Sequence, residues 1–169
     1  MILDRPIGVA GAGSIGCFVG GMFAASGRRV ALLARPRVIQ EIEGNGLQLT
    51  SFEGLARNIV SSALTLSEDA RILGNAGVVL VTVKSADTAG MADLIAGHAP
   101  ADAVIVSLQN GVGNVAVLRE RLPGHRVLAG MVPFNVIALA MVDFIAPRRV
   151  TSSSNRTMQV LPNSSRCRA

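Results

Sequence analysis

The stretch Gly11-Ala12-Gly13-Ser14-Ile15-Gly16 follows a short apolar run, residues 7–10, and opens a segment with helical periodicity. This order of strand, glycine-rich turn and helix is typical of dinucleotide-binding proteins. Gly11 permits a tight turn, Gly13 leaves room for a pyrophosphate, and Gly16 lets the helix pack close to its strand. The free N–H groups and the dipole of the helix N-terminus favour bound phosphate. The alternative is a glycine-rich turn without a ligand.

The composition is that of one folded domain of ordinary size. The chain has 169 residues, of which 50% are hydrophobic, so it can bury a core and does not resemble a disordered chain. Tryptophan and tyrosine are absent, which predicts an aliphatic core. The net charge is +5, but no basic stripe with interleaved aromatic residues is present, which argues against nucleic-acid binding and suits an anionic ligand.

Targeting signals and metal motifs do not stand out. The two cysteines are far apart in the sequence and form no metal-binding pair, and residues 1–6 do not resemble a signal peptide, so we expect a cytoplasmic protein with no metal. Residues 127–142 carry no charge, but a membrane-spanning helix needs about 20 apolar residues and this segment contains Pro133 and Asn135. We expect buried strands there and no membrane association.

Strand and helix patterns alternate along the first 132 residues. Apolar runs predict strands at residues 7–10, 29–33, 78–83, 103–108 and 127–132, with helices between them. The run 78–83 has no polar alternation, which indicates a strand buried on both faces. The predicted fold class is therefore α/β, with a doubly wound parallel sheet.

Three local expectations accompany this fold. In the first helix, Ile15, Val19, Met22 and Phe23 recur at helical spacing and should face the sheet. Residues 47–52 and 58–63 are expected to form a short hairpin. A short helix is expected to start at residues 67–70, where acidic residues suit the helix dipole.

Arg35, Lys84 and Asn110 each follow a predicted strand, at the sheet edge where ligands bind in such folds. NAD-specific domains place Asp or Glu at the end of the second strand, whereas Arg35 can bind a 2′-phosphate in a forked geometry, which favours NADP. Lys84 is the only lysine in the sequence. The alternatives are a solvated arginine, a surface lysine, and an ordinary Asn-Gly turn at Asn110.

These motifs resemble those of the ketopantoate reductases (2-dehydropantoate 2-reductases), which reduce a 2-oxo acid with NADPH in pantothenate synthesis. The resemblance covers about residues 6–138 and includes Val83-Lys84-Ser85 and Gln109-Asn110-Gly111. It implies a Rossmann-like domain whose glycine loop, residues 11–16, binds the pyrophosphate. It also implies that Arg35 binds the 2′-phosphate, that Lys84 lies near cofactor and substrate, and that Asn110 bridges the nicotinamide ribose and the substrate.

In the resembling family the proton donor is a lysine in a second, helical domain, and no lysine follows Lys84. We therefore expect an NADP-binding domain over residues 1–138, with the C-terminal helical domain missing and the chain inactive as it stands. Residues 139–169 are expected to form an irregular, poorly ordered tail outside the family's reading frame, because back-translating residues 141–159 in another frame can spell a family-like segment. The expected partners are a 2-oxo acid and a second copy of the chain, through exposed sheet surface.

Two other functions stay open from the sequence. One is a module that binds NADP without turnover, which the missing lysine favours. The other is the cofactor domain of a different dehydrogenase, such as a glycerol-phosphate type, against which the motifs at Lys84 and Asn110 argue.

Overall fold

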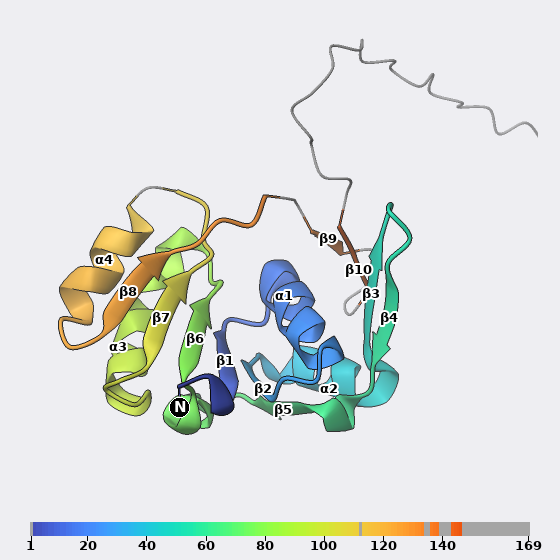
Figure 1. The fold of residues 1–169 in the computed structure, drawn as a ribbon, viewed down its shortest axis with the longest axis horizontal. Coiled ribbons are helices and arrows are strands. Elements are labelled where there is room, and N and C mark those ends of the chain that lie inside the picture. Colours follow the sequence, from blue (N-terminus) through green and yellow to red (C-terminus); the bar gives the residue numbers. More distant parts are fainter. Residues whose placement is uncertain (1, 112, 134–135, 139–142, 147–169) are drawn as a thin grey trace, which may run out of the picture.

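The computed structural model describes residues 2–111, 113–133, 136–138 and 143–146. These residues form two sheets, with the strand orders β5-β2-β1-β6-β7-β8 and β4-β3-β10-β9 (Figure 1). In the larger sheet every neighbouring pair is parallel. Its strands are β1 (Ile7–Ala10), β2 (Val30–Leu33), β5 (Leu64–Ser67), β6 (Val78–Val81), β7 (Val104–Ser107) and β8 (Arg126–Ala129).

Helices cover both faces of the larger sheet, which confirms the doubly wound α/β fold. The α-helices are α1 (Ser14–Ala25), α2 (Pro36–Asn45), α3 (Thr88–His98) and α4 (Asn114–Arg121). Short 3-10 turns are η1 (Ile2–Asp4), η2 (Ser61–Ala63), η3 (Ala70–Asn75) and η4 (Ser85–Asp87). Helices α1 and α2 share one core cluster with β1 and β2, and α3 and α4 share another with β6 and β7.

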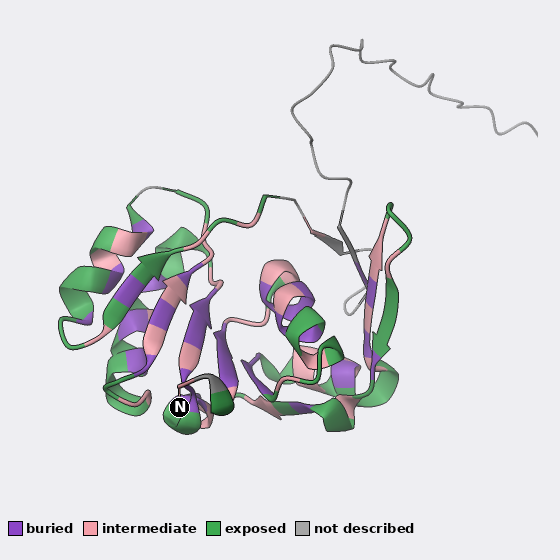
Figure 2. Cartoon of the chain, viewed as in Figure 1, coloured by how far each residue is buried: buried purple, intermediate pink, exposed green. Residues whose placement is uncertain are grey.

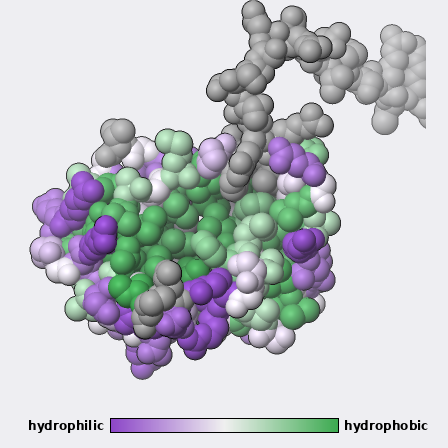
Figure 3. Space-filling view, in the orientation of Figure 1, coloured by the Kyte–Doolittle hydropathy of each residue, from purple (hydrophilic) through white to green (hydrophobic). Residues whose placement is uncertain are grey.

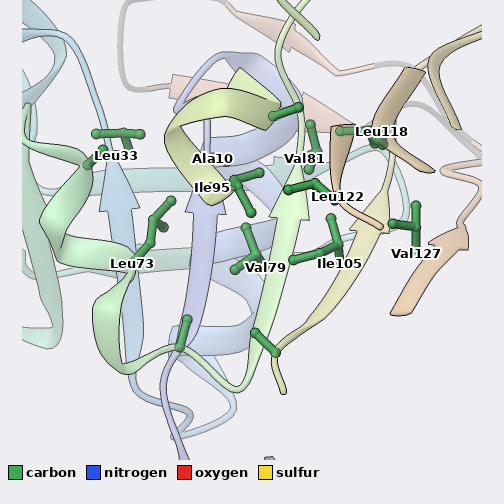
Figure 4. Close-up of a cluster of buried hydrophobic side chains, with 14 residues drawn as sticks. Ala10, Leu33, Leu73, Val79, Val81, Ile95, Ile105, Leu118, Leu122 and Val127 are labelled. Atoms are coloured by element: carbon green, nitrogen blue, oxygen red, sulfur yellow. The ribbon is translucent and has the colours of Figure 1, made fainter. Parts of the chain in front are cut away.

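The second core cluster is aliphatic, as the composition predicts. Figure 4 shows Ile95 of α3 and Leu118 of α4 in one cluster with Val79 and Ile105 of the sheet. All four side chains are fully buried. Figure 2 shows the same pattern across the molecule, with buried strands at the centre and exposed outer helix surfaces. The apolar runs at residues 7–10, 29–33 and 78–83 therefore form buried strands, as expected. The expectation of a buried strand at residues 127–132 is wrong in part, because β8 ends at Ala129, Leu128 is 38% exposed and Met131 is 86% exposed.

The expected orientation of α1 is wrong. Met22 and Phe23 are 36% and 37% exposed, and the residues that α1 buries against the sheet are Gly16, Cys17, Phe18, Gly20 and Gly21. A Cβ on Gly20 would lie 2.8 Å from the Leu32 side chain, so the glycines bring the helix close to the strands. Because α1 is apolar on all sides, its periodicity does not reveal which side is buried.

The region after α2 differs in part from the expectation. The hairpin is confirmed, with β3 (Leu47–Ser51) antiparallel to β4 (Ala56–Ile59). The sequence reasoning missed β5, which completes the larger sheet beside β2. The helix expected from residue 67 is instead the 3-10 turn η3, capped by the side chain of Asp69, which accepts a hydrogen bond from the Arg71 amide.

The smaller sheet extends the fold past residue 138. Strand β9 (Ile137–Ala138) pairs antiparallel with β10 (Asp143–Ala146), and β10 pairs parallel with β3. Phe144 is 3% exposed and belongs to the first core cluster. The expectation of an irregular tail is wrong for residues 143–146, and residues 147–169 lie outside the described residues. Among the described residues, no helix is long and apolar enough to cross a membrane.

Candidate dinucleotide-binding site

The glycine loop has the backbone geometry that its sequence predicts. Gly11 has φ +108°, and a Cβ there would collide with Val83 on the neighbouring strand's end. A Cβ on Gly16 would overlap the carbonyl oxygen of Gly11 and lie 2.7 Å from Thr82 Oγ1. Gly11 therefore excludes a side chain because of its backbone conformation. Gly16 excludes one because the helix packs closely on the strand.

Gly13 differs from its neighbours because nothing lies within 4 Å of where its Cβ would be. It is exposed and occupies the N-cap of α1, where its carbonyl accepts a hydrogen bond from the Cys17 amide at 2.8 Å. The amides of Ser14, Ile15 and Gly16 open the helix and have no intrahelical acceptor. This combination of open space and free N–H groups suits a phosphate.

Thr82 is a site residue that the sequence reasoning missed. Its hydroxyl donates to the Gly11 carbonyl at 2.6 Å, and its amide donates to the Ala10 carbonyl at 3.1 Å. The hydroxyl thereby fixes the peptide that turns the chain out of β1. The signal in the sequence was a lone hydroxyl residue near the end of the apolar run 78–83.

Cys17 lies behind the loop as a buried packing residue. Burial raises the pKa of its thiol to about 12, so the thiol stays neutral at physiological pH. Its Sγ lies 3.4 Å from the Ala12 carbonyl oxygen. A neutral, buried thiol is unreactive, which agrees with the packing role that small apolar cysteines have.

Arg35 lies one strand away from the glycine loop, at the carboxyl end of β2. The two loops are joined by the Ala12 amide, which donates to the Leu33 carbonyl at 3.1 Å. Arg35 forms the N-cap of α2, and its carbonyl accepts from the Val38 amide at 2.9 Å. The main chain is therefore held in place, while the exposed guanidinium has no hydrogen-bond or ion-pair partner among the residues that the structure describes.

Lys84 and Asn110 lie on the other side of the glycine loop, after β6 and β7. The loops that carry them touch, because Ser85 Oγ lies 3.4 Å from the Asn110 carbonyl oxygen. Both residues are exposed. Gly111 follows with φ +104°, so the turn after Asn110 requires glycine. A hollow beside Asn110, between the ends of β7 and β8, is lined in part by Leu108 and Met131.

All the predicted site residues thus lie at one edge of the sheet, along the strand order β2-β1-β6-β7. From β1 the chain adds β2 and then β5 on one side of β1, and it later adds β6, β7 and β8 on the other side. The glycine loop, at the end of β1, therefore lies where the direction of strand addition reverses. Ligands of open α/β sheets bind in the crevice at this point.

The sequence model of the PanE/ApbA ketopantoate reductases matches residues 7–158. The chain belongs to the ketopantoate reductase family. The matched range includes the glycine loop and all of the larger sheet, and it extends twenty residues past the boundary expected at residue 138. The Rossmann-like fold that the motifs predict is therefore the fold of a ketopantoate reductase cofactor domain.

Individual ketopantoate reductases agree with this assignment. The 2-dehydropantoate 2-reductase of Halobacterium salinarum is 37% identical over 123 residues, which cover 72% of this chain and 39% of that protein. The crystal structure of a PanE/ApbA family ketopantoate reductase from Ralstonia eutropha superposes with a TM-score of 0.76 and 33% identity, covering 83% of this chain and 46% of that one. This chain thus spans less than half the length of these relatives.

A more distant similarity concerns the fold alone. D-mandelate dehydrogenase, solved with NADH and anilino(oxo)acetate, superposes with a TM-score of 0.68 at 20% identity. This fold is therefore shared beyond the ketopantoate reductases.

Proposed function

We propose that this chain is the NADPH-binding half of a 2-dehydropantoate 2-reductase, which converts ketopantoate to pantoate in pantothenate biosynthesis. The observation that carries the proposal is the open Gly13 position at the N-terminus of α1, with Arg35 one strand away. Within the described part of the chain, the Arg35 guanidinium has no partner. An anionic dinucleotide needs both features: a cradle for its pyrophosphate and a cation for its 2′-phosphate.

Each site residue has a role in this proposal. The loop Gly11-Ala12-Gly13-Ser14-Ile15-Gly16 binds the pyrophosphate through main-chain amides. Arg35 binds the 2′-phosphate and sets the preference for NADP over NAD. Lys84 and Asn110 lie toward the nicotinamide end, where the ammonium suits an anionic 2-oxo acid and the amide can bridge ribose and substrate. NADPH supplies the hydride, and these residues bind and orient the reactants around it.

The test compares NADPH and NADH binding by fluorescence titration in the wild type and in Arg35→Ala. A charge-assisted hydrogen bond to the 2′-phosphate contributes about 1.5–3 kcal/mol, so the wild type should prefer NADPH by roughly ten- to hundredfold. Arg35→Ala should remove this preference and leave NADH binding unchanged. Arg57→Ala is the matched control, because Arg57 is an exposed arginine on β4. Equal wild-type affinities for the two cofactors would refute the role of Arg35.

We also propose that the 169-residue polypeptide binds cofactor without reducing ketopantoate. The alkoxide formed by hydride transfer needs a proton, positioned acid catalysis contributes typically 10²–10⁴-fold, and Lys84 is the only lysine in this sequence. NADPH absorbance followed with ketopantoate present should show no turnover above background. Robust turnover by the purified polypeptide would overturn this part of the proposal.

A further inference from the structure

Buried polar side chains connect the two loops that carry Lys84 and Asn110. Thr88, the first residue of α3, is 1% exposed, and Asn114, the first residue of α4, is 6% exposed. Thr88 Oγ1 accepts a hydrogen bond from Gln109 Nε2 at 2.7 Å and lies 3.1 Å from Asn114 Oδ1. Because the Gln109 amide supplies one hydrogen, the hydroxyl donates its own to the Asn114 carbonyl. Thr88 therefore fixes the orientation of both amides.

The Gln109 amide holds the residue before Lys84. Its Nε2 donates to the Val83 carbonyl at 3.0 Å and to Thr88 at 2.7 Å, which uses both of its hydrogens. Its Oε1 accepts from the Ser107 hydroxyl at 3.1 Å. Both hydrogens and the oxygen of the Gln109 amide are thus hydrogen-bonded, and a rotation of this amide would break its bond to the Val83 carbonyl.

The Asn114 amide holds the residue after Lys84 and the main chain of Asn110. Its Nδ2 donates to Ser85 Oγ at 3.1 Å and to the Asn110 carbonyl at 2.8 Å. Lys84 therefore lies between the Val83 carbonyl, which the half-buried Gln109 amide holds, and the Ser85 hydroxyl, which the buried Asn114 amide holds. The Asn114 amide also holds the main chain of Asn110. Both amides depend on the single hydroxyl of Thr88.

We propose that Thr88 is a positioning residue for the nicotinamide half of the cofactor site. This inference rests on the proposed function, in which Lys84 and Asn110 lie at that half. A buried amide that loses its partner is costly, so without the hydroxyl the amides of Gln109 and Asn114 take other orientations. The loops that they hold then shift, while the glycine loop and Arg35, on the far side of β6, keep their places.

The test uses Thr88→Val, which removes the hydroxyl and keeps the branched shape, and Thr88→Ser, which keeps the hydroxyl. Each variant is titrated with NADPH and with adenosine 2′,5′-bisphosphate, which carries the 2′-phosphate but no nicotinamide. Thr88→Val should weaken NADPH binding about tenfold, the effect of one neutral hydrogen bond, and leave bisphosphate binding unchanged. Thr88→Ser should bind both ligands as the wild type does.

Thr50→Val is the control for losing a hydroxyl elsewhere, because Thr50 Oγ1 donates to the Phe144 carbonyl at 3.2 Å in the smaller sheet. It should change neither affinity. Equal weakening of both ligands by Thr88→Val, or normal NADPH binding by the folded variant, overturns the inference. A wild type that binds neither ligand overturns the proposed function and this inference with it.

A second variant covers the case in which Thr88→Val shows no cooperative melting transition. Asn114→Asp keeps the acceptor for Thr88 and removes both donors, and a carboxylate suits the first turn of α4. It should produce the same split between the two ligands. Wild-type affinity for NADPH in a folded Asn114→Asp variant contradicts the positioning role.

Discussion

At the scale of single residues, the glycines of the loop serve three different purposes. Gly11 is required by its left-handed backbone and Gly16 by the contact between helix and strand, whereas Gly13 has open space in front of it. A methyl group at Gly13 fits the protein and obstructs only a ligand. A methyl group at Gly16 cannot fit the protein at all. The same substitution should therefore separate binding from stability at these two positions.

We predict that Gly13→Ala lowers NADPH affinity by about tenfold or more and reduces stability by at most about 1 kcal/mol, the usual range for an N-cap change. Gly16→Ala should destabilise the fold by about 1–3 kcal/mol through overpacking. Gly97→Ala is the control, since Gly97 lies in α3 with open space around it and alanine favours helix. Urea melts and NADPH titrations measure both quantities. A Gly13→Ala variant that binds NADPH normally contradicts the phosphate assignment.

The residues that could be predicted from the sequence are those whose role follows from local rules. The three glycines, Arg35 and the strand-end positions of Lys84 and Asn110 depend on short-range geometry and on the winding of the sheet, and the structure places them as expected. Their contacts with a cofactor stay predictions. Thr82 and Thr88 could not be found this way, because their partners lie on other elements and the loops beside them, up to 72 residues away for Thr82.

At the scale of elements, a helix or strand could be predicted where its apolar residues form a run of sufficient length or a clear periodic pattern. Five strands of the larger sheet were found from continuous apolar runs, although the run at β8 did not mark burial on both faces. Strand β5 was missed because its four residues follow directly on the hairpin and η2. The orientation of α1 could not be derived, since an all-apolar helix has no polar side to mark its exposed face. Strand β10 was missed because its partner β3 lies far away in the sequence.

Strand β10 contributes Phe144 to the core, which yields a prediction about where the folded unit ends. Phe144→Ala should destabilise the protein by about 3–5 kcal/mol, as large-to-small core substitutions of Phe do. Phe52→Ala, at a position that is 61% exposed, should change stability by less than about 0.5 kcal/mol. Chemical denaturation measures both variants. If Phe144→Ala is as stable as Phe52→Ala, the folded unit ends before β10, near the boundary expected from the sequence.

At the scale of the whole molecule, helices cover both faces of the larger sheet but leave apolar side chains exposed at its β8 end. Leu128 of β8 is 38% exposed and Met131 is 86% exposed, and Met22 and Phe23 of α1 are also partly exposed. Figure 3 shows this hydrophobic surface across the middle of the view, over β6, β7 and α1. Exposed apolar patches of this kind mark interaction sites. We propose a second copy of this chain as the partner that covers this surface.

We predict that the 17.5 kDa chain self-associates at a concentration of about 100 μM, at which an association with a micromolar Kd is nearly complete. Leu128→Glu should shift the protein toward the monomer, because a carboxylate is costly to bury at an apolar interface. Val60→Glu, at a position that is 59% exposed and next to η2, should have no effect. Light scattering coupled to size-exclusion chromatography measures the mass. A monomeric wild type at this concentration rules out the proposed partner.

The glycines on the buried side of α1 also affect which substitutions the protein can accept during evolution. Since Gly16 and Gly20 bring the helix against the sheet, backbone atoms and strand side chains set the distance between α1 and β1. Aliphatic residues elsewhere in the core can then be exchanged for one another without moving the first turn of the helix. Substitutions in the aliphatic core during evolution therefore leave the position of the phosphate-binding turn unchanged. Substitution of the few glycines that contact the strands does change it.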